Sequence, residues 1–428
     1  MLALPEGAGG QSAATAAPDS VQAAGRIAYL ESIRGLASLQ VLLLHTFSAF
    51  APILVFSEAP SSLAGAVRFS PLFLFYDGLF AVYVFFTLSG FVLTPAFARW
   101  ADRPFALATS RWLRLAIPAL VAVTIAMAIK LLVGAAPAEA ARAIGLDWFV
   151  KAWSPPRAPT YFFFDALVQG LWAGYSNTSI LPDLGLPLVI QPVTASYLPP
   201  LWTLSVEMQG SLLIATLVVA ARRSRLLWTV LFALCLVFLL RTYFLCFLIG
   251  HVLARFDART LLRRTPAGLL FALAMIGLCL SLADEYGAVA ALASCERQRA
   301  LWTPCTPHLL KMVGAVLTLV AALGASGLEA MLTRRPFVSL GRLSFSLYLI
   351  HWPIVCGVCA ALFLAIGGGE DSSWARAAAM AAAIVLSLVG AGLFSRIDAW
   401  AIAASRRLRS DLAQPERRLT PPAAAAPR

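Results

Sequence analysis

Two ionisable residues, Arg34 and His45, lie inside an apolar stretch of the chain, residues 26–50. Eleven positions make three helical turns plus about 20°, so in an α-helix both side chains share one face, roughly 16 Å apart along the axis. Such residues are costly in lipid and usually point into a helical bundle, where they mark a functional site. Imidazole titrates near neutral pH, which makes His45 a candidate general base. The alternative is that Arg34 and His45 reach opposite membrane interfaces.

A glutamate in a later apolar run, Glu207, is the second candidate catalytic residue. It shares a helical stripe with Thr203 in the motif PPLWTLSVEMQGS. An ionised carboxylate without a partner is costly in a bilayer, so we expect it to contact Arg34 or His45. Beside His45, it would orient the imidazole and stabilise its cationic form, as the acid does in a catalytic triad. A structural salt bridge is the alternative.

Arginines near the predicted cytoplasmic face are candidates for binding an anionic ligand. Arg111 and Arg114 are three positions apart in the motif RWLRLAIP. Two guanidinium groups on one helix face suit phosphates or carboxylates. Ser89 and Gly90, in the motif FFTLSGF, precede a further arginine, Arg99. Membrane anchoring by the arginines and helix packing by the small residues are the alternatives.

The motif LGRLSFSLYLIHWP brings two more polar side chains, Tyr348 and His351, into an apolar helix. With Trp202, they are the candidate substrate-binding residues. A packed, hydrogen-bonded structural histidine is the alternative for His351. The other two histidines, His251 and His308, are isolated, and no His, Cys or carboxylate spacing matches a zinc site. We therefore predict no metal.

The composition is that of a membrane protein. The chain has 428 residues, of which 60% are hydrophobic and 13% charged, and its mean hydropathy is +0.81. These values lie far outside the range of soluble globular proteins. The net charge of +12 is carried largely between apolar segments, which favours membrane orientation and contact with anionic lipid headgroups. We find no nucleic-acid-binding motif, and we expect no nucleic-acid partner.

The apolar runs predict an all-α, polytopic membrane domain over residues 26–400, with about ten transmembrane helices. Basic residues concentrate in alternate loops, among them ARRSR, ARFDARTLLRR and LTRRP. The positive-inside rule therefore predicts that both termini are cytoplasmic. No repeat of 20 to 50 residues is visible, which excludes a solenoid. The predicted spans are 27–50, 76–97, 113–134, 198–220, 226–240, 241–256, 267–283, 309–327, 338–365 and 375–398.

Three segments outside these spans have distinct compositions. Residues 1–25 and 401–428 are predicted to be disordered cytoplasmic tails. The connection over about residues 135–197 would face outside, where its aromatic residues could stack on sugar rings or anchor the chain at the interface. Cys295 and Cys305 share one polar loop and could form a disulfide if that loop is extracytoplasmic, but their spacing leaves this open.

Taken in order, the motifs resemble those of acyltransferase family 3. They are ESIRGLASLQVLLLH, FFTLSGF followed by Arg99, RWLRLAIP, LWTLSVEMQ and LGRLSFSLYLIHWP. Members of this family are integral-membrane O-acyltransferases that modify bacterial surface and exported polysaccharides, and they commonly have ten membrane helices. The resemblance covers residues 26–400.

The resemblance implies a role for each matching residue. Arg34 and His45 match the arginine and the proposed catalytic histidine of the first helix, and Glu207 matches the carboxylate of the fourth-span motif. Glu31 stands where the family often has aspartate, which bears on acceptor preference more than on the type of reaction. The residues expected to bind the donor are Ser89, Gly90, Arg99, Arg111 and Arg114, together with Arg34, which would lie deeper along the pantetheine path.

We therefore expect a membrane-bound acyltransferase of the bacterial inner membrane. It would move an acyl group, expected to be acetyl, from acetyl-CoA to a hydroxyl of a carbohydrate or lipid-linked glycan, with membrane lipids as its surroundings. A secondary transporter or flippase for a glycan or small molecule is the alternative. The sequence leaves open the acceptor, the oligomeric state, and the choice between direct transfer and an acyl-enzyme.

Overall fold

The computed structural model shows a helical protein. Every regular element in the described part of the chain is a helix, which confirms the predicted all-α class. The described residues are 18–56, 62–146, 149, 151–155, 159–176, 191–240, 242–285 and 308–412. Cys295 and Cys305 lie outside them, so the predicted disulfide stays a prediction.

Six helical segments among the described residues are long and apolar enough to cross a membrane. A seventh would be the pair α15 and α16, which meet at an angle of 89°. Three shorter apolar helices occupy further predicted spans, so the structure supports a polytopic membrane protein, while the count of ten stays a prediction. The six segments are Ala28–Phe50 of α1 (Pro18–Phe50), α4 (Gly78–Ala98), α5 (Pro104–Val133), α9 (Leu201–Arg223), Arg335–Ala365 and α19 (Ser373–Leu412). The shorter helices are α10 (Arg225–Leu239), α11 (Phe244–Arg255) and α13 (Ala267–Ala283), and the bent pair is α15 (Leu309–Gly324) with α16 (Ser326–Leu332).

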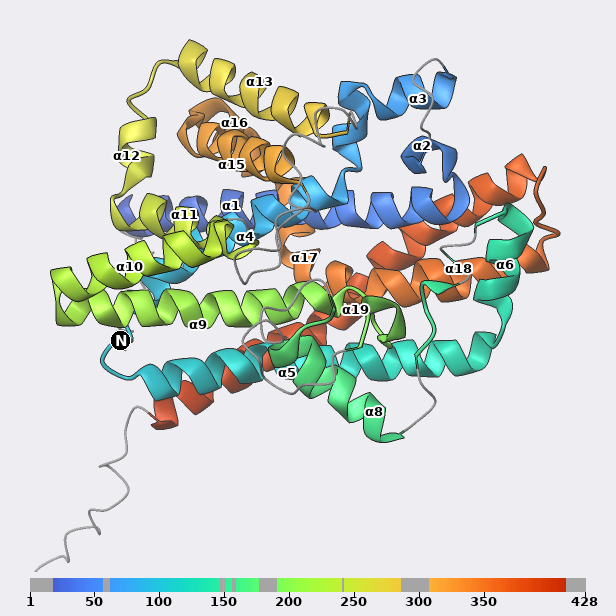
Figure 1. Ribbon diagram of the computed structural model, residues 1–428, viewed down its shortest axis with the longest axis horizontal. Coiled ribbons are helices and arrows are strands. Elements are labelled where there is room, and N and C mark those ends of the chain that lie inside the picture. Colours follow the sequence, from blue (N-terminus) through green and yellow to red (C-terminus); the bar gives the residue numbers. More distant parts are fainter. Residues whose placement is uncertain are drawn as a thin grey trace, which may run out of the picture.

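The long helices lie broadly along one direction, with most connections at the two ends of the bundle (Figure 1). We call the end where α5 begins and α9 ends the basic end, because Arg99, Arg222 and Arg223 lie there. It is on the left in Figure 1. The opposite end carries α6 (Ala136–Ile144) and the turn between α18 (Cys359–Ala365) and α19.

Helix α1 lies between two hydrophobic cores. Leu42 and Phe50 belong to a core shared with α5, α17 (Arg335–Pro353) and α19, whereas Tyr29 and Val41 belong to one shared with α4 and α11. An apolar helix buried on more than one side can position polar groups deep inside the bundle. In this way α1 becomes the element around which both halves pack.

Glycines allow the closest helix crossings. A Cβ on Gly35 of α1 would lie 2.6 Å from the backbone nitrogen of Gly341 in α17, and a Cβ on Gly90 of α4 would lie 2.3 Å from the carbonyl oxygen of Phe247 in α11. Both distances are too short for any side chain. Small residues permit such close backbone packing in membranes.

The helix ends differ from the sequence-based boundaries in three places. Helix α1 begins at Pro18 and α19 continues to Leu412, so parts of both predicted disordered tails are helical. Within the predicted outer connection, α6, α8 (Pro159–Phe163) and the π-helical segment η2 (Phe164–Ala173) are formed. Proline-rich and glycine-rich sequence concealed these short helices, because none is long enough to read as a span.

Candidate active site

A cavity of about 100 Å³ lies among α1, α4, α5, α9 and α17. Its walls combine three arginines with one carboxylate, several hydroxyl groups and apolar side chains. The sequence-predicted residues among them are Arg34, Arg111, Arg114, Glu207 and Tyr348. Four helices that are far apart in sequence therefore bring five of the predicted site residues to one place.

Two of the three arginines are already paired with carboxylates. Arg111 donates to Glu207 through Nη2, and its Nε donates to Ser211 Oγ at 3.0 Å. Arg114 donates to Asp398 of α19. Asp398 was missed by the sequence analysis, although an isolated aspartate in an apolar run is a sign that a buried cation is near.

Arg34 has a different environment. Its guanidinium lies 5.5 Å from the centre of the Phe85 ring, and its Nε is buried without a hydrogen-bond partner in the described part of the chain. No carboxylate described here is within ion-pair distance of it. With Arg111 and Arg114 balanced by Glu207 and Asp398, Arg34 gives the cavity one net positive charge, which favours an anionic or strongly polar ligand.

Tyr348 connects the cavity to the histidines. Its hydroxyl lies 2.8 Å from Thr203 Oγ1 and 3.2 Å from the carbonyl oxygen of Pro200. The ring of Tyr348 lies 5.8 Å, centre to centre, from that of His351. Tyr348 therefore has one face on the cavity and another on His351, which does not itself line the cavity.

His45 and His351 form a pair. His45 Nδ1 is 3.0 Å from His351 Nε2, and the two ring planes are inclined by 25° with their centres 5.0 Å apart. His351 Nδ1 is 3.1 Å from the carbonyl oxygen of Leu347, and the edge of Trp352 covers His45 on another side. His351 is fully buried, whereas His45 is half-buried. The contacts from Tyr348 to His351 to His45 thus lead from the cavity to a partly accessible imidazole.

The predicted contact of Glu207 with Arg34 or His45 is wrong for this structure, because neither residue pairs with Glu207 in the described part of the chain. Glu207 binds Arg111, and Nδ1 of His45 faces His351. The prediction failed for a simple reason. The sequence shows which face of α1 and which face of α9 is polar, but it does not show which helix each polar face packs against. Glu207 instead secures the cavity wall.

One spacing explains why the two histidines meet. Gly35 and His45 are ten residues apart in α1, and Gly341 and His351 are ten residues apart in α17. The helices touch at the two glycines and again at the two histidines, so they run in parallel and in register for about 15 Å. This matched spacing was present in the sequence and was not used there.

The remaining predicted residues lie elsewhere. Ser89 and Gly90 are buried where α4 crosses α11, and neither lines the cavity. Arg99 is exposed at the basic end. Trp202 is partly buried beside Phe86 and Tyr243, next to the cavity residue Thr203.

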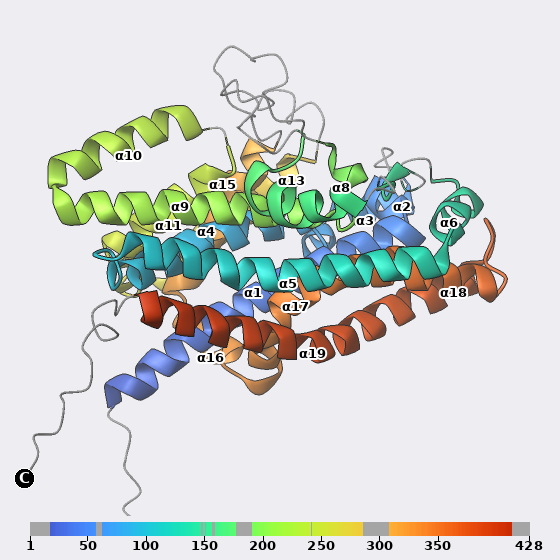
Figure 2. The same cartoon turned by 90° about the horizontal axis from the view of Figure 1, so that it is seen from below.

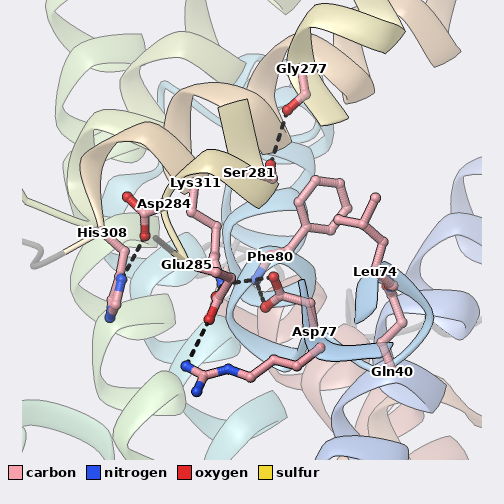
Figure 3. Close-up of polar contacts among 11 residues, drawn as sticks. Gln40, Leu74, Asp77, Phe80, Gly277, Ser281, Asp284, Glu285, His308 and Lys311 are labelled. Carbon is pink, nitrogen blue, oxygen red and sulfur yellow. Dashed lines mark hydrogen bonds and ion pairs between the residues drawn. The ribbon is translucent and has the colours of Figure 1, made fainter. Parts of the chain in front are cut away.

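A second group of charged residues lies outside the cavity and was not predicted from the sequence. We call it the Lys311 cluster; it consists of Lys311, Asp77, Glu285 and Arg68. Lys311 of α15 is 2.7 Å from Asp77 and also pairs with Glu285, which in turn contacts Arg68 at 3.2 Å. Figure 3 shows the side chains of Lys311, Asp77 and Glu285 turned toward one another between the start of α4 and the facing ends of α13 and α15. Asp77 also accepts from the backbone N–H of Phe80 and so caps α4.

A buried carboxylate, Asp165, holds the connection that precedes α9. It accepts hydrogen bonds from the hydroxyl of Tyr175 at 2.8 Å, from Ser196 at 3.0 Å and from the backbone N–H of Tyr197 at 2.8 Å. Burial raises the pKa of Asp165 to about 6, although these donors oppose the rise. The network fixes η2 against the start of α9, close to Pro200 and Thr203.

The described residues contain no group of three or more His, Cys, Asp or Glu side chains that could hold a metal ion. The absence of a metal in the reaction therefore stays a prediction.

Fold and site together define a multi-pass membrane protein whose bundle encloses an arginine-lined cavity linked to a histidine pair. The family model described as an acyltransferase domain matches residues 27–396. The chain belongs to this family, acyltransferase family 3, and is a membrane acyltransferase, as its motifs indicated. No curated protein and no solved structure matches the chain.

Proposed function

We propose that the protein transfers an acetyl group from acetyl-CoA to a hydroxyl group of a cell-surface or exported carbohydrate. The observation that carries the proposal is the run of contacts from the cavity through Tyr348 and His351 to the half-buried His45. A donor held against the arginines and an acceptor reaching His45 would meet along this run. Membership of an acyltransferase family favours this enzyme over the transporter and flippase alternatives.

In the proposed reaction, His45 takes the proton of the acceptor hydroxyl as its oxygen attacks the thioester carbonyl carbon. The C–S bond then breaks, and the thiolate of CoA leaves with the proton that His45 returns. The products are an acetyl ester and CoA, so no oxidant or further reactant is needed. Direct transfer is the simplest scheme for a site in which one imidazole is accessible.

Arg34 would bind the donor, since it is the cavity cation that has no described carboxylate partner. Arg111 and Arg114 would support it indirectly, because their charges are already engaged by Glu207 and Asp398. The sequence-based expectation had Arg34 and the two paired arginines all bind the donor, so the proposal differs from it in giving Arg111 and Arg114 an indirect role. Arg99, exposed at the basic end, remains a candidate contact for the nucleotide of CoA.

The experiment uses the purified full chain in liposomes with radiolabelled acetyl-CoA and a panel of bacterial glycans. We expect label on a glycan with wild type and a loss of at least about 10²-fold with His45→Ala, the scale of a general-base contribution. His308→Ala is the matched control, because His308 lies outside the site and pairs with Asp284. Label transfer that survives His45→Ala would overturn the role of His45, and substrate uptake without covalent transfer would overturn the proposed reaction.

A further inference from the structure

We infer that His351 is a positioning residue that fixes the tautomer of His45, leaving the Nε2 lone pair of His45 free for an incoming hydroxyl. The inference rests on the proposed function in treating His45 as the base. The tautomer itself can be measured without any acyl transfer, so the two ideas can fail separately.

The proton of the first contact can be assigned from the chemistry of its partners. A carbonyl oxygen only accepts hydrogen bonds, so His351 Nδ1 must donate in its 3.1 Å contact with Leu347. A neutral imidazole carries one ring proton, which leaves His351 Nε2 as an acceptor. A doubly protonated His351 would be a fully buried cation with no carboxylate among the described residues in contact with it, which is costly.

The second contact then has only one assignment. His45 Nδ1 lies 3.0 Å from the accepting Nε2 of His351, so His45 donates from Nδ1. In neutral His45 this leaves Nε2 without a proton. The His45 ring also has a backbone hydrogen bond to Val41, four residues earlier in α1, as His351 has to Leu347. No side chain in the described part of the chain hydrogen-bonds to Nε2 of His45, and Nε2 is not one of the buried, unpartnered atoms, so an acceptor hydroxyl can reach it.

The matched glycine-to-histidine spacing gives this arrangement its precision. Because α1 and α17 are in contact at Gly35 and Gly341, neither helix can slide without a backbone clash. The hydrogen-bonded rings of His45 and His351 lie ten residues further along both helices. The backbone therefore sets the distance between the histidines, as is needed when a supporting residue must hold a catalytic group.

His251 shows what a structural histidine looks like in the same protein. It is fully buried, its Nε2 accepts from the indole N–H of Trp228 at 3.1 Å, and its Nδ1 is 2.9 Å from Thr94 Oγ1. Both ring nitrogens are occupied, so His251 has no lone pair to offer a substrate. His45 differs in having one nitrogen engaged and the other accessible.

Two amide substitutions separate positioning from packing. In His351→Gln, the amide oxygen can reach the place of Nε2 and accept from His45, whereas in His351→Asn the shorter amide can reach Leu347 but not His45. We expect kcat of His351→Gln to stay within about tenfold of wild type. For His351→Asn we expect a loss of about 10²- to 10⁴-fold in kcat, with the KM for acetyl-CoA unchanged, as when a catalytic histidine loses its tautomer. Equal losses in both variants, or a full kcat in His351→Asn, would overturn the inference.

Nitrogen-15 NMR of histidine-labelled protein in detergent measures the tautomer directly. We expect His45 to be protonated at Nδ1 and unprotonated at Nε2 in wild type and in His351→Gln, and to gain Nε2–H in His351→Asn. His251→Asn is the matched control for loss of a buried histidine and should leave the signals of His45 unchanged. A wild-type His45 protonated at Nε2 would overturn the inference even in an active enzyme. The expected tautomer in a protein that transfers no acyl group would contradict the proposed function instead.

Discussion

The arginine-lined cavity and the Lys311 cluster both bury several charges, but they satisfy them differently. In the Lys311 cluster, one lysine lies between Asp77 and Glu285 (Figure 3). Arg68 completes the group through its contact with Glu285. In the cavity, Arg34 has no described carboxylate partner. The first arrangement closes on itself and joins α4 to α13 and α15, whereas the second leaves a positive charge available to a ligand.

This difference separates stability from function. A cluster in which every buried charge has an oppositely charged partner affects how much of the protein is folded. A cluster in which one cation lacks a carboxylate partner affects what the folded protein binds. In Figure 1 the seam between α13 and α15 lies to one side of the bundle, away from α5 and α19, which run alongside each other in Figure 2. Substitutions in the two kinds of cluster should therefore differ in what they change, with the largest effect expected on stability.

Lys311→Met should cost the most stability. Removal of the buried ammonium leaves Asp77 and Glu285 without their shared cation, which we expect to lower the free energy of unfolding by about 3–5 kcal/mol. Thermal unfolding of the detergent-solubilised protein measures the loss, and activity per folded molecule should be kept. Lys151→Met, at an exposed lysine, is the matched control. A loss of activity at unchanged stability would place the Lys311 cluster in the reaction.

Asp165 gives a second closed cluster, with a pH dependence of known sign. Its pKa in the folded protein, about 6, is above the value of about 3.9 for an unfolded chain. Folding therefore favours the protonated form of Asp165. The stabilisation that this protonation gives the folded protein is complete below about pH 4 and is lost as the pH rises to about 6. The expected difference is about 3 kcal/mol. Hydrogen exchange of the backbone N–H of Tyr197 between pH 4 and 7 measures it, relative to Asp165→Asn, in which the trend should vanish. A trend of equal size in Asp165→Asn would contradict this assignment.

Gly341→Ala tests whether the helix crossing holds the site together. The new Cβ would lie 2.5 Å from the backbone of Glu31, so α1 and α17 must move apart, at a cost of about 1–3 kcal/mol. Because the histidine pair depends on the same crossing, kcat should fall well beyond the lost folded fraction. Gly327→Ala is the matched control, since a Cβ there meets nothing within 4 Å. Normal kcat in folded Gly341→Ala would separate the crossing from the reaction.

Arg34→Ala should have the smallest effect on stability and a selective effect on the donor. The loss of one unpaired cation should raise the KM for acetyl-CoA about tenfold, equivalent to about 1.4 kcal/mol, with little change in thermal unfolding. Arg376→Ala is the matched control, because Arg376 contacts the backbone of Glu370 at the opposite end. An unchanged KM in Arg34→Ala would reduce Arg34 to a packing residue and would remove the functional half of the comparison.

Hydropathy and motif order predicted the helical class, the membrane location and five of the residues that line the cavity. Arg34, Arg111, Arg114, Glu207 and Tyr348 were all identified before their positions were known. The pattern succeeds because a polar residue in an apolar helix is costly wherever it points, so its presence alone is informative.

It was harder to predict which buried side chains bind each other than to predict which side chains belong to the site. Glu207 binds Arg111 across 96 positions of sequence, and Asp398 binds Arg114 across 284. Helical periodicity gives the face of each helix that is polar but not which faces meet, since this depends on how all the helices pack. The close contact between Gly35 and Gly341 supplies the missing information, because it fixes one pair of helices in register.

The central claim is that the donor reaches His45 from the arginine-lined cavity. Cryo-electron microscopy of the full chain in lipid nanodiscs, with a non-hydrolysable acetyl-CoA analogue, tests it most directly. We predict that the analogue contacts Arg34 and that its carbonyl carbon lies within about 6 Å of His45 Nε2, which leaves room for one acceptor hydroxyl between them. An analogue bound away from the cavity, or with its carbonyl carbon out of reach of His45, would contradict the claim.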